Sequence, residues 1–232
     1  TLTVCGAARM SLWQRFKSAE RGWRNRLGED ISSPAMRRRA WRHYLFIDHG
    51  VLRVLWRNFH EIDTGVYRSN QPSPRRLAQF RAMGVKTILN LRGVGEHSHY
   101  LFEKEACAEL GLTLIDHTMF AADLVSRENL IELEHLFRTI EKPFVMHCKS
   151  GADRTGLAAV LYLMVIKNQP VDQALDQLHW RFVHLKQSKN GILDFFFEAY
   201  QRDAAGRDIS LSDWIRTEYD PQTLRAEYFG TA

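Results

Sequence analysis

The chain has 232 residues, of which 45% are hydrophobic, which suffices for one α/β domain with an appendage and is short for two full domains. Its three cysteines show no disulfide spacing, which favours a reducing compartment, and no apolar run is long enough to span a bilayer. The net charge of +5 is unevenly distributed: residues 1–60 hold twelve basic and four acidic side chains, so they carry +8 and the remainder carries −3.

A basic, helical N-terminal extension is expected over residues 1–58. Apolar side chains recur near helical spacing at Leu12, Trp13, Phe16, Trp23 and Leu27. Pro34 should begin a second helix, which carries Trp41, Tyr44, Leu45 and Ile47 until Gly50 interrupts it. We expect the aromatic side chains to pack against the following domain. The alternative is an amphipathic helix that contacts an anionic membrane surface.

From residue 59 onward, strand patterns alternate with helix patterns. Short strands are predicted at 59–62, 66–68, 85–91, 112–118 and 143–147. Helices are predicted from Pro74, at 100–110, at 126–140, at 155–168, from Pro170 and at 191–201. The alternation predicts an α/β fold with a central, mostly parallel sheet flanked by helices. The domain is expected over 59–218, with a C-terminal tail at 219–232.

The most informative segment, residues 147–156, joins a buried strand to a buried helix and reads HCKSGADRTG. A loop that enters a helix N-terminus presents free backbone N–H groups, and the helix dipole adds positive potential. Together they favour a bound tetrahedral dianion. Gly151 and Gly156 permit tight turning. Arg154, in the first helical turn, can offer two parallel donors to two phosphate oxygens.

The same positive field should act on Cys148. A thiol beside a guanidinium and a helix N-terminus has a lowered pKa, so it is a thiolate that can attack phosphorus. We expect His147 to support the loop and Thr155, in preference to Ser150, to hydrogen-bond the sulfur. The residues expected to bind phosphate are Lys149, Ser150, Gly151, Ala152, Asp153 and Arg154. The Asp153 side chain is expected to bind loop amides or a basic neighbour.

The pattern H-C-x-x-G-x-x-R-T-G resembles the phosphate-binding loop of cysteine-dependent protein tyrosine phosphatases of the dual-specificity type, and most closely a bacterial branch. Segments 67–72 and 87–93 are also similar, and the resemblance covers roughly residues 60–200. It implies hydrolysis of phosphate monoesters through a phosphocysteine intermediate, with phosphotyrosine in proteins as the leading substrate and no cofactor. No metal is expected, because His97 and His99 lack carboxylates at ligand spacing.

The resemblance further implies an aspartate that protonates the leaving group, on a mobile loop 25–35 residues before the cysteine. Asp123 lies 25 residues upstream of Cys148 and Asp116 lies 32 residues upstream. Asp116 falls in or at the end of a predicted strand, whereas Asp123 falls in the loop before Ser126. Because loops supply movable catalytic groups, we favour Asp123 and hold Asp116 in reserve.

Three alternatives remain for the function. The basic, Trp-rich extension favours a phosphatase of a phospholipid or lipid-linked sugar phosphate at a membrane surface. A phosphate-binding module without turnover is a second alternative. A nucleic-acid binder rests on the basic extension alone, so no nucleic-acid partner is expected. We expect a cytoplasmic protein with peripheral membrane contact as an option, and the start at Thr1 leaves export open.

Overall fold

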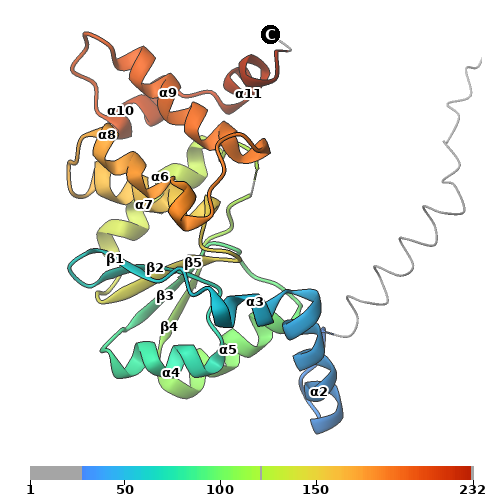
Figure 1. The fold of residues 1–232 in the computed structure, drawn as a ribbon. Coiled ribbons are helices and arrows are strands. Elements are labelled where there is room, and N and C mark those ends of the chain that lie inside the picture. Colours follow the sequence, from blue (N-terminus) through green and yellow to red (C-terminus); the bar gives the residue numbers. More distant parts are fainter. Residues whose placement is uncertain (1–27, 121, 231–232) are drawn as a thin grey trace, which may run out of the picture.

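The computed structural model describes residues 28–120 and 122–230, which form a five-stranded sheet in the order β1-β2-β5-β3-β4 (Figure 1). The strands are β1 (His60–Asp63), β2 (Val66–Asn70), β3 (Thr87–Asn90), β4 (Thr113–Asp116) and β5 (Phe144–Cys148). β1 pairs with β2 in the antiparallel sense, and every other neighbouring pair is parallel. The predicted mostly parallel α/β fold is therefore confirmed.

Helices cover both faces of this sheet, as Figure 1 shows. One face carries α4 (Pro74–Ala82) and α5 (Ser98–Leu110). The other carries α6 (Arg127–Thr139) and α7 (Asp153–Val165), and α9 (Ile192–Ala204) lies beyond them, farther from the sheet. Alternate strand residues enter the two cores, so that Val145 packs under α4 and α5 whereas Met146 and Cys148 belong to the core of the other face. Cys107 is buried in the first of these cores, as predicted.

The helix boundaries follow local sequence signals. Ser73 and Ser126 accept hydrogen bonds from the third residue after each of them, and Pro74 takes the first position of α4. Gly111 ends α5 with a φ of 64°, in the left-handed region that favours glycine. These caps and the glycine stop agree with the predicted positions.

The described part of the N-terminal extension forms α2 (Pro34–Arg42), a π-helical turn (His43–Ile47) and α3 (Gly50–Leu55). Gly50 was expected to interrupt the helix, but the break falls earlier, at Asp48 and His49, and Gly50 begins α3. A Cβ at Gly50 would lie 2.6 Å from the carbonyl oxygen of Tyr44, so glycine is required by close packing. The first predicted helix, from Leu12 to Leu27, lies outside the described residues.

The extension packs against α5. The indole of Trp41 stacks on Phe102 with ring centroids 4.4 Å apart, and Tyr44 is buried beside them. Arg37 binds the carboxylate of Glu105 in α5 through both terminal guanidinium nitrogens, at 2.7 and 2.5 Å. The predicted packing of the aromatic side chains against the domain is thus confirmed for Trp41 and Tyr44.

Beyond α7 the chain forms α8 (Val171–Ala174), three short 3-10 turns (Leu175–Gln177, Trp180–Phe182 and Lys189–Gly191), α10 (Leu211–Thr217) and α11 (Pro221–Phe229). Tyr219 is buried, and its hydroxyl donates to the carbonyl of Val125 at 2.7 Å. Leu224 of α11 joins the same core. The described residues before position 59 and after position 218 therefore pack on the domain. The expected domain boundaries at 58 and 219 remain a proposal.

Candidate active site

Cys148 is the last residue of the central strand β5, and α7 begins five residues later at Asp153. The loop between them lies at the carboxyl edge of the parallel strands, where open α/β sheets bind ligands. Asn70 of β2 pairs with Cys148 in register. Arg154 is the second residue of α7, so the strand-loop-helix arrangement predicted for these residues is present.

Three successive carbonyl groups of this loop are bound by donors from other segments. The carbonyl oxygen of Lys149 accepts a hydrogen bond from the N–H of Gln71 at 3.3 Å. The carbonyl oxygen of Ser150 accepts from the side-chain amide of Asn58 at 3.1 Å. The carbonyl oxygen of Gly151 accepts from the guanidinium of Arg68 at 2.7 Å. A trans peptide carries its C=O and the next N–H on opposite sides. The N–H groups of residues 150–152 are therefore turned toward the inside of the loop.

Gly151 fits this path because it lacks a side chain. Its φ is +72°, and a Cβ there would lie 2.7 Å from the carbonyl oxygen of Ser69 and 2.8 Å from the nitrogen of Asn70. Both contacts are with backbone atoms of β2, which cannot swing away. Any other residue at position 151 would have to push the loop off β2.

Arg68 was not singled out by sequence as a site residue. It lies in β2 with no exposed surface, and besides Gly151 it binds the backbone and side-chain oxygens of Gln177 at 2.8 Å. Its guanidinium lies 3.7 Å from the ring centroid of Phe182. Burial lowers the pKa of Arg68 to about 9, a fall that the Cys148 thiolate opposes, so the side chain is still a cation at neutral pH.

Burial is the largest influence on the pKa of Cys148, and it raises that pKa. The charge of Arg154 and hydrogen bonds from the Thr155 hydroxyl and the N–H groups of Thr155 and Gly151 outweigh it, so the pKa lies below its ordinary value. Thr155 Oγ1 is buried and has no partner besides this sulfur. The arrangement stabilises a thiolate. Cys107, in contrast, has its pKa raised to about 12 by burial.

The loop that follows β4 passes over Arg154. The guanidinium of Arg154 donates to the carbonyl of Met119 at 3.4 Å, and Met119 is buried. Asp123 lies farther along this loop, where its side chain is 43% exposed and pairs with Arg225 of α11 at 3.1 Å.

Asp116 is held differently. It ends β4, two strands from β5 and hence roughly 10 Å across the sheet from Cys148. Both of its carboxylate oxygens are occupied, one by the amide of Asn90 at 2.8 Å and the other by the hydroxyl of Tyr100 at 2.7 Å. A fixed carboxylate of this kind suits a structural role better than proton donation.

His147 lies behind the loop, buried, with Nε2 2.7 Å from Glu103 of α5. The contacts continue outward from Glu103 to Gln71 at 2.9 Å and from Gln71 to Arg92 at 2.9 Å. Arg92 then binds Asp48 of the extension, at 2.9 and 3.2 Å. A continuous polar network thus joins the residue before Cys148 to the N-terminal extension.

Asp48 is surrounded by cations. Arg53 lies 2.8 Å and Lys149 3.5 Å from its carboxylate, in addition to Arg92. Burial would raise the pKa of Asp48, but the hydrogen bonds and charge of Arg92 and the charge of Arg53 hold it far below the usual range. Lys149, predicted to bind phosphate, is 40% exposed at the loop and is shared with Asp48.

The Asp153 side chain is paired with a basic neighbour, as expected from sequence. Nδ1 of His184 lies 2.8 Å from Asp153, and Nε2 lies 2.8 Å from Asp194. Burial would lower the pKa of His184, but the hydrogen bonds to these two carboxylates outweigh it and raise the pKa to about 9. Any contribution of Asp153 to phosphate binding is therefore left to its backbone N–H. In the described ranges, no group of three or more His, Cys, Asp or Glu side chains could hold a metal ion.

Comparisons with known proteins show which family the chain resembles. A family model described as "Tyrosine phosphatase family" matches residues 57–173. The chain is 26% identical over 129 residues to the dual specificity protein phosphatase TpbA of Pseudomonas aeruginosa, which covers 52% of this chain and 53% of that protein. It is 27% identical over 111 residues to the protein tyrosine phosphatase domain-containing protein 1 of Bos taurus, covering 43% of this chain.

The match spans about half the length of TpbA and 14% of the length of the bovine protein. Among solved structures, the crystal structure of P. aeruginosa TpbA superposes with a TM-score of 0.48 at 22% identity, over 74% of this chain and 90% of that one.

The paired His184 generates a prediction about stability and pH. Because its pKa is raised from 6.5 to about 9, its contribution is fully present below pH 6.5 and is lost as the pH rises through about 9. His184→Gln should therefore lower the free energy of unfolding by on the order of 2 kcal/mol near pH ~6 and by much less near pH ~10. Urea unfolding at the two pH values measures this, with His135→Gln on the exposed face of α6 as control. A deficit that is equal at both pH values would contradict the assignment.

Proposed function

This chain belongs to the tyrosine phosphatase family, and we propose that it hydrolyses phosphate monoesters with Cys148 as the nucleophile and Arg154 as the phosphate clamp. The observation that carries the proposal is the loop of inward N–H groups around a cysteine whose pKa is lowered. Donors fixed in advance toward developing negative charge supply a large share of catalysis in such sites.

In the first proposed step, the Cys148 thiolate attacks the phosphorus of the bound monoester. A sulfur–phosphorus bond forms while the bond from phosphorus to the ester oxygen breaks. The leaving oxygen takes a proton from the carboxylic acid of Asp123, so a neutral alcohol or phenol departs. Arg154 binds two phosphate oxygens throughout this transfer.

In the second step, water attacks the phosphorus of the phosphocysteine. The Asp123 carboxylate takes the proton of this water, and the sulfur–phosphorus bond breaks to release inorganic phosphate and restore the thiolate. The hydroxyl of Thr155 supports the sulfur as it leaves, since it is buried and has no other partner. His147 is a positioning residue that acts through the network of Glu103.

Protein phosphotyrosine is the substrate we favour, with phosphoserine or phosphothreonine as a further option. The proposal draws on the family and on the likeness to TpbA, which is named a dual specificity protein phosphatase. A cytoplasmic location is also proposed, because cysteines are few and the two in the described part of the chain, Cys107 and Cys148, are free thiols.

A second candidate is a phosphatase of lipid-linked phosphate at a membrane surface. Large apolar side chains of the extension are exposed, namely Phe46 (66%), Val51 (46%), Leu52 (60%), Leu55 (85%) and Trp56 (47%). Exposed arginines of α2 accompany them at positions 38, 39 and 42. Exposed apolar side chains and cationic groups on one segment are features of proteins that bind anionic lipid. Among the described helices, none has the length and apolar character needed to cross a bilayer.

Two substitutions test the nucleophile and the clamp. Cys148→Ser should abolish hydrolysis of p-nitrophenyl phosphate, because a serine hydroxyl is not ionised in this field. Arg154→Ala should lower kcat/KM by roughly a hundredfold or more, since the phosphate loses its bidentate partner. Circular dichroism checks that both variants remain folded. A folded Arg154→Ala enzyme with nearly full activity would refute the clamp.

Leaving-group dependence tests the general acid. Asp123→Ala should reduce turnover by roughly 10²–10⁴-fold for alkyl phosphates, whose leaving groups need a proton, and far less for p-nitrophenyl phosphate. Asp116→Ala is the comparison, and it should affect both substrates alike because Asp116 is held by Asn90 and Tyr100. If the leaving-group signature appears in Asp116→Ala and not in Asp123→Ala, the assignment of the acid is wrong.

Vesicle sedimentation tests the membrane candidate. The double variant Leu52→Ser and Leu55→Ser should bind vesicles of phosphatidylglycerol and phosphatidylcholine roughly tenfold or more weakly than the wild type, because two exposed leucines no longer enter the lipid. Met83→Ser with Val94→Ser, which replaces two exposed apolar residues elsewhere, is the control. Absence of wild-type binding would remove this candidate.

A further inference from the structure

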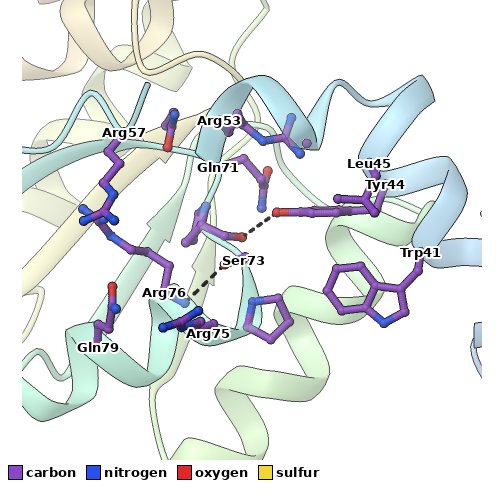
Figure 2. A pocket seen from close by; sticks show the side chains of 14 residues that line it. Trp41, Tyr44, Leu45, Arg53, Arg57, Gln71, Ser73, Arg75, Arg76 and Gln79 are labelled. Carbon is purple, nitrogen blue, oxygen red and sulfur yellow. Dashed lines mark hydrogen bonds between the residues drawn. The ribbon is translucent and has the colours of Figure 1, made fainter. Parts of the chain in front are cut away.

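A cavity of about 440 Å³ lies between the N-terminal extension and the beginning of α4 (Figure 2). Its walls come from the extension on one side, including Tyr44 and Arg53, and from residues 70–76 and Gln79 on the other. A volume of this size is in the range of small-molecule sites. The catalytic cysteine and Arg154 do not line it, so it is distinct from the site described above.

The cavity is strongly basic. Four arginines line it, Arg53, Arg57, Arg75 and Arg76, and none of the residues that line it is acidic. Within the described part of the chain, Arg57, Arg75 and Arg76 form no ion pair with a carboxylate. Figure 2 shows the side chains of Arg57 and Arg76 extending toward the same corner. Burial first, and then the charge of Arg57, lowers the pKa of Arg76, as expected for like charges held together.

Arg53, one of the four arginines, is largely buried and is held by Asp48. Its side chain is 8% exposed, and it binds Asp48 through its terminal nitrogens. Its Nε is buried and has no hydrogen-bond partner. Arg53 therefore contributes its positive charge to the wall of the cavity, while its terminal nitrogens are held by Asp48.

The remaining walls define what kind of acceptor fits. The first turn of α4 lines the cavity through Ser73 and Pro74, so the positive end of the helix dipole adds to the arginines. Opposite lie Trp41, Tyr44 and Leu45, which form an apolar side. Guanidinium groups match the geometry of phosphate oxygens, and the apolar side matches an organic group attached to the phosphate.

We propose that this cavity is a second phosphate-binding site, which takes a phosphate group carried by an organic molecule. The cavity adjoins the catalytic loop through Asn70 and Gln71, which both line it. Asn70 is the strand partner of Cys148, and the N–H of Gln71 donates to the carbonyl of Lys149. The phosphate belongs either to a second position of the substrate or to a separate molecule. The assignment to a second position of the substrate rests on the proposed function. The existence of the binding site does not depend on it.

Calorimetric titration with phenylphosphonate tests the site without turnover, because this probe has a dianion and a ring but no ester bond. In the Arg154→Ala background, which disables the catalytic clamp, one binding event should remain. Adding Arg57→Gln with Arg76→Gln should weaken it about tenfold or more, as two charged donors are lost. Arg38→Gln with Arg39→Gln removes the same charge from the exposed face of α2 and should leave binding unchanged.

Arg76 also packs over the rings of Phe59 and Phe80, so its replacement could disturb the fold. Arg57→Gln with Arg75→Gln, both exposed side chains, is therefore the second variant, and it should also weaken binding. Equal binding by all variants, or an equal loss in the Arg38 and Arg39 control, would overturn the proposal.

A kinetic comparison identifies the source of the phosphate. Wild-type enzyme is given phosphotyrosine peptides with one or with two phosphotyrosines at several spacings. If the second phosphate belongs to the substrate, the doubly phosphorylated peptide has a lower KM than the singly phosphorylated one. The double variant Arg57→Gln with Arg76→Gln should lose this difference in KM. Its kcat for p-nitrophenyl phosphate should be unchanged. Equal KM values alongside intact phenylphosphonate binding assign the site to a separate molecule. Failure of wild-type turnover would count against the proposed function and not against the binding site.

Discussion

The site depends on the direction of three peptide groups. A loop that binds a phosphate dianion over a thiolate must keep its carbonyl oxygens away from both, because inward oxygens would repel two negative charges. Here Asn58, Arg68 and Gln71 hold those oxygens from outside, at 2.7–3.3 Å. The N–H groups are thereby fixed before any ligand arrives, which is how preorganised donors gain their effect. The long-range contacts of Asn58, Arg68 and Gln71 are thus as important to the anion cradle as the loop itself.

The N-terminal extension belongs to this arrangement. Asp48 lies at the break between the π-helical turn and α3, and it is buried among Arg53, Arg92 and Lys149. A buried carboxylate needs such partners, since removing one leaves the others unpaired at considerable cost. Through Arg92 and Gln71 the same carboxylate connects to Glu103 and His147 behind the cysteine. Movement of the extension would therefore reach both the loop and the arginine-lined cavity.

Sequence predicted the features whose signals are local. The five strands, the caps at Ser73 and Ser126, the stop at Gly111 and the loop that follows Cys148 are each determined by neighbouring residues. Arg68 was missed because its partners lie at Gly151 and Gln177, 83 and 109 residues away, and strand periodicity does not show where a buried cation points. The identity of His184 as the basic partner of Asp153 also depends on packing between distant segments. A charged residue inside an otherwise buried strand is the one signal that could have revealed Arg68.

The two aspartates before the cysteine differ in how firmly they are held, and this difference bears on which can act as an acid. Asp116 accepts two hydrogen bonds from Asn90 and Tyr100 at the end of a strand, and each would have to break before it could move. Asp123 is half exposed, accepts a hydrogen bond from the N–H of Leu124 in its own loop at 2.9 Å, and forms an ion pair with Arg225, whose side chain is 56% exposed. Exposed pairs contribute at most about 1 kcal/mol, so this one is easily released. Its loop already contacts Arg154 through Met119. In the proposed mechanism, a short movement of this loop would bring Asp123 to the phosphate that Arg154 is proposed to bind.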